Sequence, residues 1–193
     1  MSKPERLMSK QGFVIWLTGL CASGKTTIAK GLEQELKARS CLVEVLDGDA
    51  VRTNLSRGLG YSREDRITNL RRIAFVANLL SRNGVVAIVA AISPYREARE
   101  EIFANLDVEC LEVFVNAPID ICEARDVKGL YAMARAGELL AFTGIDDPYE
   151  APLSPDITCY TAEETPGQSI AKVLAELEQR ELVPQKPLVE FFI

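Results

Sequence analysis

The chain has 193 residues, of which 48% are hydrophobic and 26% charged, proportions that are ordinary for one globular domain with a sizeable core. Its formal net charge of −6 argues against a general nucleic-acid-binding surface, and no apolar run approaches the length of a membrane span. The sequence contains no histidine, which excludes a histidine general base, a Ser-His triad and a histidine-ligated metal site.

The cysteines and the N-terminus indicate the compartment. The five cysteines are odd in number and not closely paired, so we expect buried thiols in a reducing environment. The opening residues MSKPER carry charges without an apolar stretch behind them, so we expect no secretory signal and a cytoplasmic protein. Residues 1–11 are expected to form a flexible N-terminus.

A phosphate-binding loop follows the first predicted strand, residues 13–17. Residues 19–26, GLCASGKT, match the pattern GxxxxGK[ST] at every fixed position, and residues 27–39 continue with helical spacing. Glycines let backbone N–H groups surround a phosphate, and the next helix directs its positive end at the same anion. We expect Lys25 to neutralise phosphate charge and Thr26 to bind Mg²⁺. The alternative is a glycine turn with a chance Lys-Thr.

An acidic turn follows the second predicted strand, residues 41–46. The turn is Asp47-Gly48-Asp49. Ligands of open α/β sheets bind beyond the carboxyl ends of the strands, so both carboxylates are expected near the phosphate loop. One of them could hold Mg²⁺ or accept a hydroxyl proton. A plain Asp-Gly turn is the alternative.

The next stretch is locally basic in an acidic protein. It comprises a short predicted helix over 50–56, a loop over 57–61 and a long helix over 63–82, which Ser62 is expected to cap with Asp65 in capping-box register. Its arginines predict either a site for a compact anion or a solvated helix face. On the long helix, Arg66 and Asn69 are neighbours that could both face a ligand cleft. The six arginines are Arg52, Arg57, Arg63, Arg66, Arg71 and Arg72.

The third predicted strand, residues 85–92, is a continuous apolar run, as expected for a central parallel strand. Many phosphate-loop enzymes carry an acidic Mg²⁺ ligand at the end of this strand, whereas this chain has Ser93. The Asp47/Asp49 turn is therefore the expected source of the metal carboxylate. A helix over 96–106 and a strand over 110–115 follow.

The remaining elements complete one α/β domain. Pro118 is expected to begin a helix, another helical stretch runs to about residue 140, and residues 125–150 are predicted to form a lid over the nucleotide. A fifth strand over 156–159 and a helix capped by Thr165, ending near residue 181, come last. We predict a mainly parallel five-stranded sheet flanked by helices, with a domain at 12–182 and a tail at 183–193. These features predict a phosphate-loop kinase of a small anionic acceptor.

Five segments in unbroken order give the chain a closer resemblance. It resembles the adenylyl-sulfate kinases, which make 3′-phosphoadenylyl sulfate from ATP and adenylyl sulfate on a P-loop nucleoside-kinase-like fold. The resemblance covers roughly residues 12–160, and its last two segments are far more specific than the phosphate loop. The matching segments are GFVIWLTGLCASGKTT, LDGDAVR, LGYSREDRITNLRR, AAISPYREAR and RDVKGLYAMARAGELLAFTGIDDPYEAP.

The resemblance implies a role for individual positions. The ATP site would comprise Gly19, Leu20, Cys21, Ala22, Ser23, Gly24, Lys25, Thr26, Thr27 and Arg125. The adenylyl sulfate site would comprise Asp49, Arg52, Tyr61, Arg66, Asn69, Ile92, Ser93, Lys128 and Phe142. Aromatic rings at Tyr61 and Phe142 suit a clamp on adenine, and the cations suit its phosphosulfate. The catalytic candidates are Lys25, Asp47, Asp49 and Ser93, and the Mg²⁺ ligands are Thr26 and Asp47.

Some alternatives stay open at this point. In the family the serine at the Ser93 position is described as a phosphorylated intermediate, but direct in-line transfer needs no covalent enzyme, and we favour a hydrogen bond from Ser93 to substrate. Rival functions are another small-molecule phosphate-loop kinase, such as one for a sugar acid or shikimate, and a nucleotide-binding regulator without turnover. We expect ATP and adenylyl sulfate as partners, with no nucleic acid or membrane. The family is often dimeric, which allows a homodimer.

Overall fold

The computed structural model describes residues 11–184 and contains one five-stranded sheet in the order β2-β3-β1-β4-β5. Every neighbouring pair of strands is parallel, so the predicted α/β class with a parallel sheet is confirmed. The strands are β1 (Val14–Thr18), β2 (Leu42–Asp47), β3 (Val85–Ala90), β4 (Cys110–Asn116) and β5 (Ile157–Tyr160). The helices are α1 (Lys25–Ala38), α2 (Gly48–Asn54), α3 (Arg63–Arg82), α4 (Arg96–Ala104), α5 (Ile119–Arg125), α6 (Leu130–Arg135) and α7 (Pro166–Gln179).

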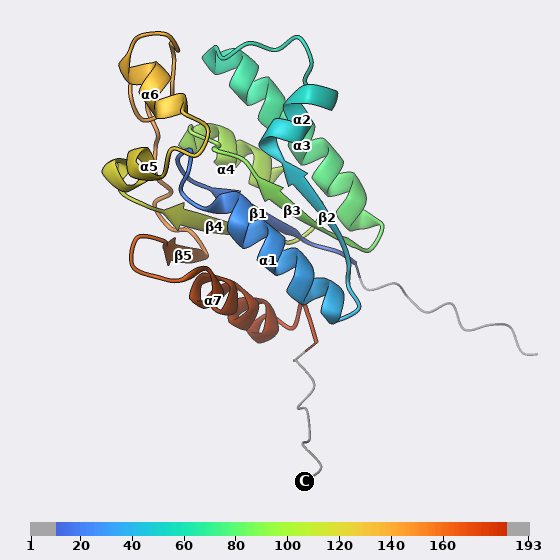
Figure 1. Ribbon diagram of the computed structural model, residues 1–193. Helices are drawn as coiled ribbons and strands as arrows, with labels where there is room; N and C mark the ends of the chain where they lie inside the picture. The colour runs from blue at the N-terminus through green and yellow to red at the C-terminus, as the bar shows by residue number, and fades with distance from the viewer. Residues whose placement is uncertain (1–10, 185–193) are drawn as a thin grey trace, which may run out of the picture.

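The sheet is covered on both faces. Alternate residues of β1 point to opposite sides, because side chains alternate along a strand. Ile15 and Leu17 pack with α1 and α7, whereas Val14 and Trp16 pack with α3 and α4. Figure 1 shows α1 and α7 on one side of the sheet and α3 and α4 on the other, with α5 and α6 beyond the end of β4. Among residues 11–184, no helix combines the length and apolarity that crossing a membrane requires.

Two helix caps follow the sequence prediction. The Ser62 hydroxyl accepts a hydrogen bond from the Asp65 backbone N–H at the start of α3, and Thr165 forms a complete capping box with Gln168 at the start of α7. The Asp65 carboxylate accepts from the Gly60 N–H, 3.0 Å away, so it secures the loop before the helix.

Several element boundaries differ from the prediction. The Asp47-Gly48-Asp49 turn is the start of α2, because the Asp47 carboxylate caps that helix by accepting from the Asp49 N–H. Pro118 is the N-cap of α5 and not its first helical residue. The helix predicted to reach residue 140 ends at Arg135. There Gly137, with φ 76°, allows the Gly137 and Glu138 N–H groups to bond back to the last turn.

The third strand is two residues shorter than predicted. β3 ends at Ala90, and the chain then turns through Ser93, whose φ of 51° lies in the left-handed region. The carbonyl of Ile92 leaves the sheet ladder and accepts from the Thr18 hydroxyl at 2.7 Å. Apolarity alone did not reveal this break, because residues 91 and 92 are as apolar as the strand itself.

The predicted termini lie largely outside the described residues. Residues 1–10 and 185–193 are not among the described residues, so the flexible N-terminus and most of the tail at 183–193 stay predictions. Val183, assigned to that tail, is 4% exposed and packs in the core between the sheet and α7.

Candidate active site

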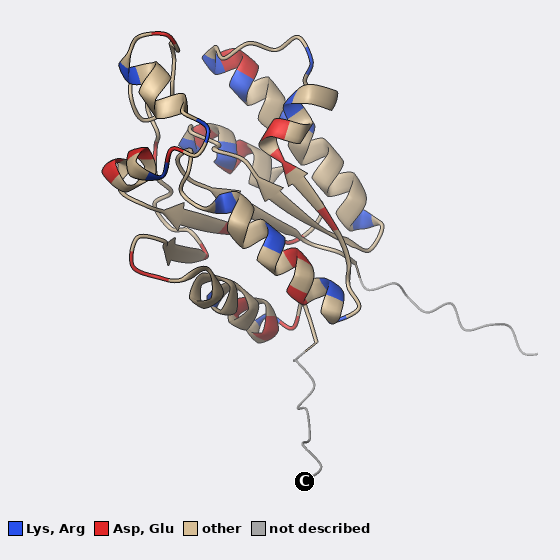
Figure 2. Cartoon of the chain, in the orientation of Figure 1, with Lys and Arg blue, Asp and Glu red and all other residues tan. Residues whose placement is uncertain are grey.

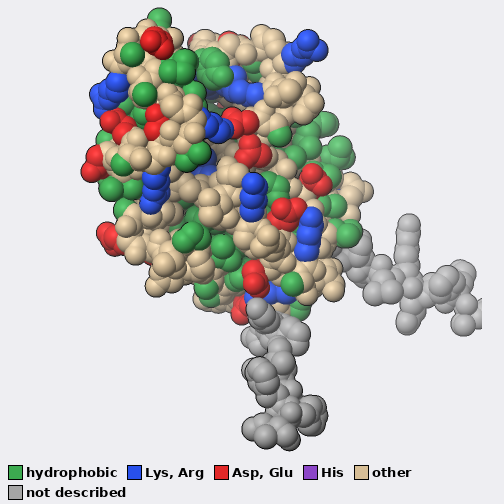
Figure 3. All heavy atoms as spheres, viewed as in Figure 1, with side chains coloured by type: hydrophobic (Ala, Val, Ile, Leu, Met, Phe, Trp, Pro, Cys, Tyr) green, Lys and Arg blue, Asp and Glu red, His purple; other side chains and the backbone are tan. Residues whose placement is uncertain are grey.

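One cavity of about 1280 Å³ lies beyond the carboxyl ends of the strands. Its walls come from the phosphate loop, the start of α2, α3, the turn after β3 and the segment 125–143. In Figure 3 the surface is hollowed between α3 and the part of the chain that holds α5 and α6, with charged side chains at the margin. In Figure 2 the positions of Lys and Arg are marked both along α2 and α3 and along the part of the chain that holds α5 and α6.

The phosphate loop places a buried cation at the floor of the cavity. Lys25 is 9% exposed and donates to the carbonyls of Gly19 and Leu20 at 3.0 and 2.6 Å. Burial lowers the pKa of Lys25 from 10.5 to about 8, although the neighbouring thiols and carboxylates oppose this shift. Lys25 also begins α1, so the backbone N–H groups of that helix point at the same place.

Three residues of the phosphate loop that were predicted for ATP do not line the cavity: Gly19, Leu20 and Ser23. A Cβ at Gly19 would come within 2.3 Å of the Val115 carbonyl oxygen, so glycine is required for the loop to pack against β4. The remaining sequence-predicted site residues all line the cavity.

Two oxygen donors suitable for Mg²⁺ lie side by side next to Lys25. The Thr26 hydroxyl donates to Asp47 Oδ2 at 3.0 Å, and Asp47 Oδ1 accepts from the Asp49 N–H at 3.0 Å. The first bond directs the Asp47 carboxylate toward the phosphate loop. Residues 11–184 contain no cluster of three or more cysteines and carboxylates that could enclose a metal. A hydroxyl and one carboxylate fit Mg²⁺, which takes few protein ligands and completes its shell with phosphates and water.

Asp49 and Lys128 meet across the mouth of the cavity. They form an ion pair between α2 and the loop before α6, and the side chains are 73% and 58% exposed. The hydrogen bond that Lys128 donates to Asp49 raises the pKa of Lys128. Lys128 therefore stays charged at neutral pH and reaches the cavity from the opposite wall.

The basic stretch divides between the two predicted roles. Of its six arginines, only Arg52 and Arg66 line the cavity. Arg71 pairs with Glu101 of α4 at 2.8 Å, and the Arg72 guanidinium donates to the Leu55 carbonyl at 3.1 Å. Arg52 and Arg66 therefore remain the candidates for the predicted anion site, while Arg71 follows the solvated-face alternative.

Arg66 connects α3 to the opposite wall. Its side chain is 9% exposed, and its guanidinium donates to the Thr143 hydroxyl and the Tyr61 carbonyl, both at 2.9 Å, and to the Ala141 carbonyl. One turn further along α3, Asn69 is 6% exposed, and its Oδ1 has no hydrogen-bond partner among the described residues. An unpaired buried amide oxygen in a cavity wall is suited to a ligand N–H or O–H donor.

Two aromatic rings border the same part of the cavity. Tyr61 is 55% exposed and carries the Arg52 guanidinium over its ring at 4.3 Å. Phe142 is 8% exposed and packs edge-on against Tyr131, with ring centroids 4.9 Å apart. One ring is thus rigidly held and the other accessible, an arrangement suited to stacking of a flat base.

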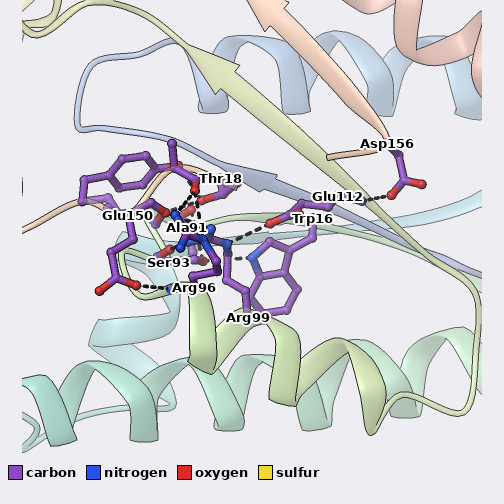
Figure 4. Close-up of polar contacts among 12 residues, drawn as sticks. Trp16, Thr18, Ala91, Ser93, Arg96, Arg99, Glu112, Glu150 and Asp156 are labelled. Atoms are coloured by element: carbon purple, nitrogen blue, oxygen red, sulfur yellow. Dashed lines mark hydrogen bonds and ion pairs between the residues drawn. The ribbon is translucent and has the colours of Figure 1, made fainter. Parts of the chain in front are cut away.

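Ser93 is already hydrogen-bonded within the protein. Its hydroxyl accepts from the Trp16 indole N–H at 2.9 Å, and the residue is 1% exposed. Figure 4 shows Trp16 and Ser93 directed toward each other beneath the turn that follows β3. Ser93 lines the cavity, while its hydroxyl is oriented by the buried Trp16.

Sequence reasoning missed one wall of the cavity. Arg125 donates to the Thr161 carbonyl at 2.5 Å and to the Ser23 carbonyl at 3.4 Å. Thr161, Glu164 and Pro166 complete this wall on the ATP side. Their types carry no chemical signal, but they follow β5, and the rule that ligands bind beyond the strand ends could have pointed to them.

Comparisons with known proteins agree with this geometry. The family model described as adenylylsulphate kinase matches residues 11–160. The adenylyl-sulfate kinase of Rippkaea orientalis is 59% identical over 172 residues, which cover 89% of this chain and 94% of that protein. The structure of the Mycobacterium tuberculosis APS kinase CysC in complex with AMPPNP and APS aligns with TM-score 0.84 and 42% identity, covering 87% of this chain and 98% of that one.

A more distant neighbour shows how far the fold alone extends. A gluconokinase from Sinorhizobium meliloti aligns with TM-score 0.56 at 15% identity, covering 89% of this chain and 94% of the other. That likeness concerns the fold and does not bear on the acceptor.

Proposed function

The chain belongs to the adenylyl-sulfate kinase family, and from that membership we propose that its cavity transfers the γ-phosphoryl group of ATP to the ribose 3′-hydroxyl of adenylyl sulfate. The products are 3′-phosphoadenylyl sulfate and ADP. The protein is an ATP-dependent phosphotransferase with an alcohol acceptor and acts in sulfate activation. The carrying observation is that the phosphate loop and the proposed acceptor residues line one cavity of about 1280 Å³, above the usual range for a single small ligand.

In the donor half, the phosphate loop holds the ATP phosphates with backbone N–H groups and Lys25. The Lys25 ammonium neutralises charge on the transferring group, as an electrostatic stabiliser must in phosphoryl transfer. Arg125, fixed between the Thr161 and Ser23 carbonyls, lies beside the ATP base.

Thr26 and Asp47 would hold Mg²⁺ through the two oxygens that already meet at 3.0 Å. When bound there, the ion supplies charge neutralisation and orientation of the phosphates. Because Asp47 would serve as the metal ligand, we assign acceptance of the 3′-hydroxyl proton to Asp49, the other carboxylate of this turn that lines the cavity. A loose transition state asks little of this base beyond orienting the hydroxyl.

In the acceptor half, Arg52, Arg66 and Lys128 supply positive charge for the phosphosulfate. Tyr61 and Phe142 stack on the adenine. Asn69 and the Ile92–Ser93 backbone position the nucleotide, and the free Oδ1 of Asn69 accepts from it.

We assign Ser93 a hydrogen-bonding role and not that of a phosphate carrier. A phosphoserine at this position would break the bond from Trp16 and place a dianion where the side chain is 1% exposed. Direct transfer between two nucleotides in one cavity requires no phosphorylated serine.

ADP release with different acceptors tests the function. Adenylyl sulfate, gluconate, shikimate and no acceptor are compared with ATP and Mg²⁺ in excess. We expect release with adenylyl sulfate alone. Release with another acceptor instead would indicate a different small-molecule kinase, and ATP binding without release in any reaction would indicate a regulator.

Arg66→Ala tests the acceptor assignment. Removal of this guanidinium should raise the KM for adenylyl sulfate by roughly tenfold or more, while the KM for ATP changes less than about twofold. Arg71→Met, which removes an arginine of the same helix outside the cavity, is the matched control. Equal losses for both substrates in Arg66→Ala would contradict the assignment.

Two further properties are separate proposals. A homodimer is allowed by the family, and light scattering coupled to gel filtration decides it. A cytoplasmic location remains a prediction, and cell fractionation tests it.

A further inference from the structure

Arg99 of α4 is the most buried arginine among residues 11–184, with 1% of the residue exposed. Its guanidinium donates in three directions, to Glu112 Oε1 at 2.8 Å, to the Ser93 carbonyl at 2.7 Å and to the Glu150 carbonyl at 2.9 Å. Figure 4 shows the side chain at the centre of this network, beneath the turn after β3. Arg99 does not line the cavity.

Two of these acceptors belong to segments that reach the cavity from opposite sides. Ser93 lies in the turn that borders the cavity, and Glu150 follows the segment 125–143, which forms the opposite wall. The two parts are also joined directly, since the Glu150 N–H donates to the Pro94 carbonyl and the Glu150 carboxylate accepts from the Arg96 N–H, both at 2.8 Å. Among residues 11–184, Arg99 is the single side chain that donates to both the Ser93 and the Glu150 carbonyl.

The backbone at Ser93 needs such support. A serine with φ 51° occupies a sparsely populated conformation, which persists only when its surroundings impose it. Its hydroxyl is held by Trp16, its carbonyl by Arg99 and the preceding carbonyl, of Ile92, by Thr18. Arg99 therefore connects the strained turn to Glu150, which follows the segment that forms the opposite wall.

We propose that Arg99 is a positioning residue for the acceptor nucleotide, which holds the Ser93 turn against the Glu150 end of segment 125–150. This inference rests on the proposed function, because it concerns the acceptor half of that cavity. The competing explanation is that Arg99 only neutralises Glu112 within the fold. The positioning role requires the bonds from Arg99 to the Ser93 and Glu150 carbonyls. The competing explanation requires only the bond from Arg99 to Glu112.

Three variants separate these explanations. Arg99→Met/Glu112→Met removes both charges, so no unpaired charge stays buried and the fold has the best prospect of surviving. Glu112→Gln retains an acceptor for Arg99 and leaves the bonds to Ser93 and Glu150 in place. Arg71→Met/Glu101→Met removes the exposed Arg–Glu pair that α4 makes with α3 and is the matched control. Each variant is assayed at a temperature where circular dichroism shows it folded.

The Arg99→Met/Glu112→Met variant should raise the KM for adenylyl sulfate by roughly tenfold or more, with less than about a twofold change in the KM for ATP. Glu112→Gln and the Arg71/Glu101 control should change neither KM by more than about twofold. Equal changes in both KM values, an unchanged KM for adenylyl sulfate, or a Glu112→Gln variant that behaves like the double variant would overturn the proposal.

A second readout does not depend on turnover. The chain has one tryptophan, Trp16, and its indole donates to the Ser93 hydroxyl, so Trp16 fluorescence reports on the turn. We expect the emission to change in Arg99→Met/Glu112→Met and to stay constant in the Arg71/Glu101 control. If the wild type releases no ADP with adenylyl sulfate, the proposed function fails, whereas unchanged Trp16 emission refutes the positioning role itself.

Discussion

At the scale of single residues, the site depends on Lys25, a cation that is buried away from water. Lys25 is buried against the carbonyls of its own loop, and that burial lowers its pKa to about 8. The phosphates of ATP would bring anionic charge next to it and raise its pKa again. Lys25 is thus held at the position where the ligand's charge develops. Burying its charge there lowers the folding stability of the substrate-free protein.

ATP affinity should therefore depend on pH. The folded pKa of Lys25 is about 8, so its ammonium loses its proton as the pH rises through 8, and the neutral amine no longer attracts phosphate. We expect the Kd for ATP to increase between pH 7 and 9.5, measured by calorimetry in buffers that differ in ionisation enthalpy. Lys25→Met removes the titrating group and should bind weakly at every pH. A wild-type Kd that stays constant over this range would show that Lys25 does not titrate between pH 7 and 9.5.

Folding stability should show the opposite sign. The folded pKa lies below the unfolded value of 10.5, so between pH 8 and 10.5 the unfolded chain binds more protons, and the contribution of Lys25 to stability rises with pH. This contribution is lowest below pH 8, where the ammonium is buried with its charge.

The two acidic side chains of α2 are separable by substitution. Asp47→Asn should raise the Mg²⁺ concentration that gives half-maximal rate, by about tenfold, because it weakens the carboxylate next to Thr26. Asp49→Asn should lower kcat and leave the Mg²⁺ requirement unchanged. Rates measured over a Mg²⁺ titration decide this, and an unaltered Mg²⁺ requirement in Asp47→Asn would remove that residue from the metal site.

At the scale of elements, caps determine where the site-bearing helices begin. Ser62 starts α3 so that Arg66 and Asn69 lie one and two turns into the helix, on its cavity side. Asp47 caps α2 through Oδ1, which accepts from the Asp49 N–H, and its Oδ2 accepts from the Thr26 hydroxyl. A capping residue can therefore serve both the backbone and the chemistry.

The cap of α7 serves the fold alone. Thr165→Ala removes the hydroxyl that accepts from the Gln168 N–H, which should cost about 1 kcal/mol and lower Tm by about 2–4 °C. We expect ADP release to change little, because Thr165 does not line the cavity. Thermal unfolding with a parallel rate assay checks both parts, and a large loss of rate with unchanged Tm would reverse the assignment.

At the scale of the molecule, an acidic protein binds two polyanions by bringing scattered cations to one cavity. Arg52 and Arg66 arrive from the α2–α3 region and Lys128 from the opposite wall. Asp49 neutralises Lys128 across the gap, and adenylyl sulfate would replace this carboxylate as the partner of the ammonium.

This exchange of partners makes a specific prediction. Lys128→Met leaves Asp49 without its cation, so it should weaken adenylyl sulfate more than Asp49→Asn/Lys128→Met does, because only the single variant retains an unpaired carboxylate that repels the anion. Equilibrium binding of adenylyl sulfate in the presence of ADP measures this without turnover. Equal affinity in the two variants would mean that Asp49 does not influence the site.

The local pattern of the sequence determined the phosphate loop, the parallel α/β class, the caps at Ser62 and Thr165 and the acidic residues after β2. Each depends on residues that are close together in the chain, so spacing and residue type were sufficient to predict it. Sequence patterns placed the boundaries less well, because the Ser93 turn and the end of α6 depend on backbone conformation and not on apolarity.

Only the tertiary structure decided which residues pair with each other across and beneath the cavity. Asp49 and Lys128 are 79 residues apart in the sequence. Arg99 donates to the carbonyl of Glu150, which is 51 residues further along the chain than Arg99 itself. These contacts follow from the strand order β2-β3-β1-β4-β5, which places the carboxyl ends of β2, β3 and β1 side by side. Strand order is set by how the helices pack on the two faces of the sheet, and no local pattern of residues encodes that packing.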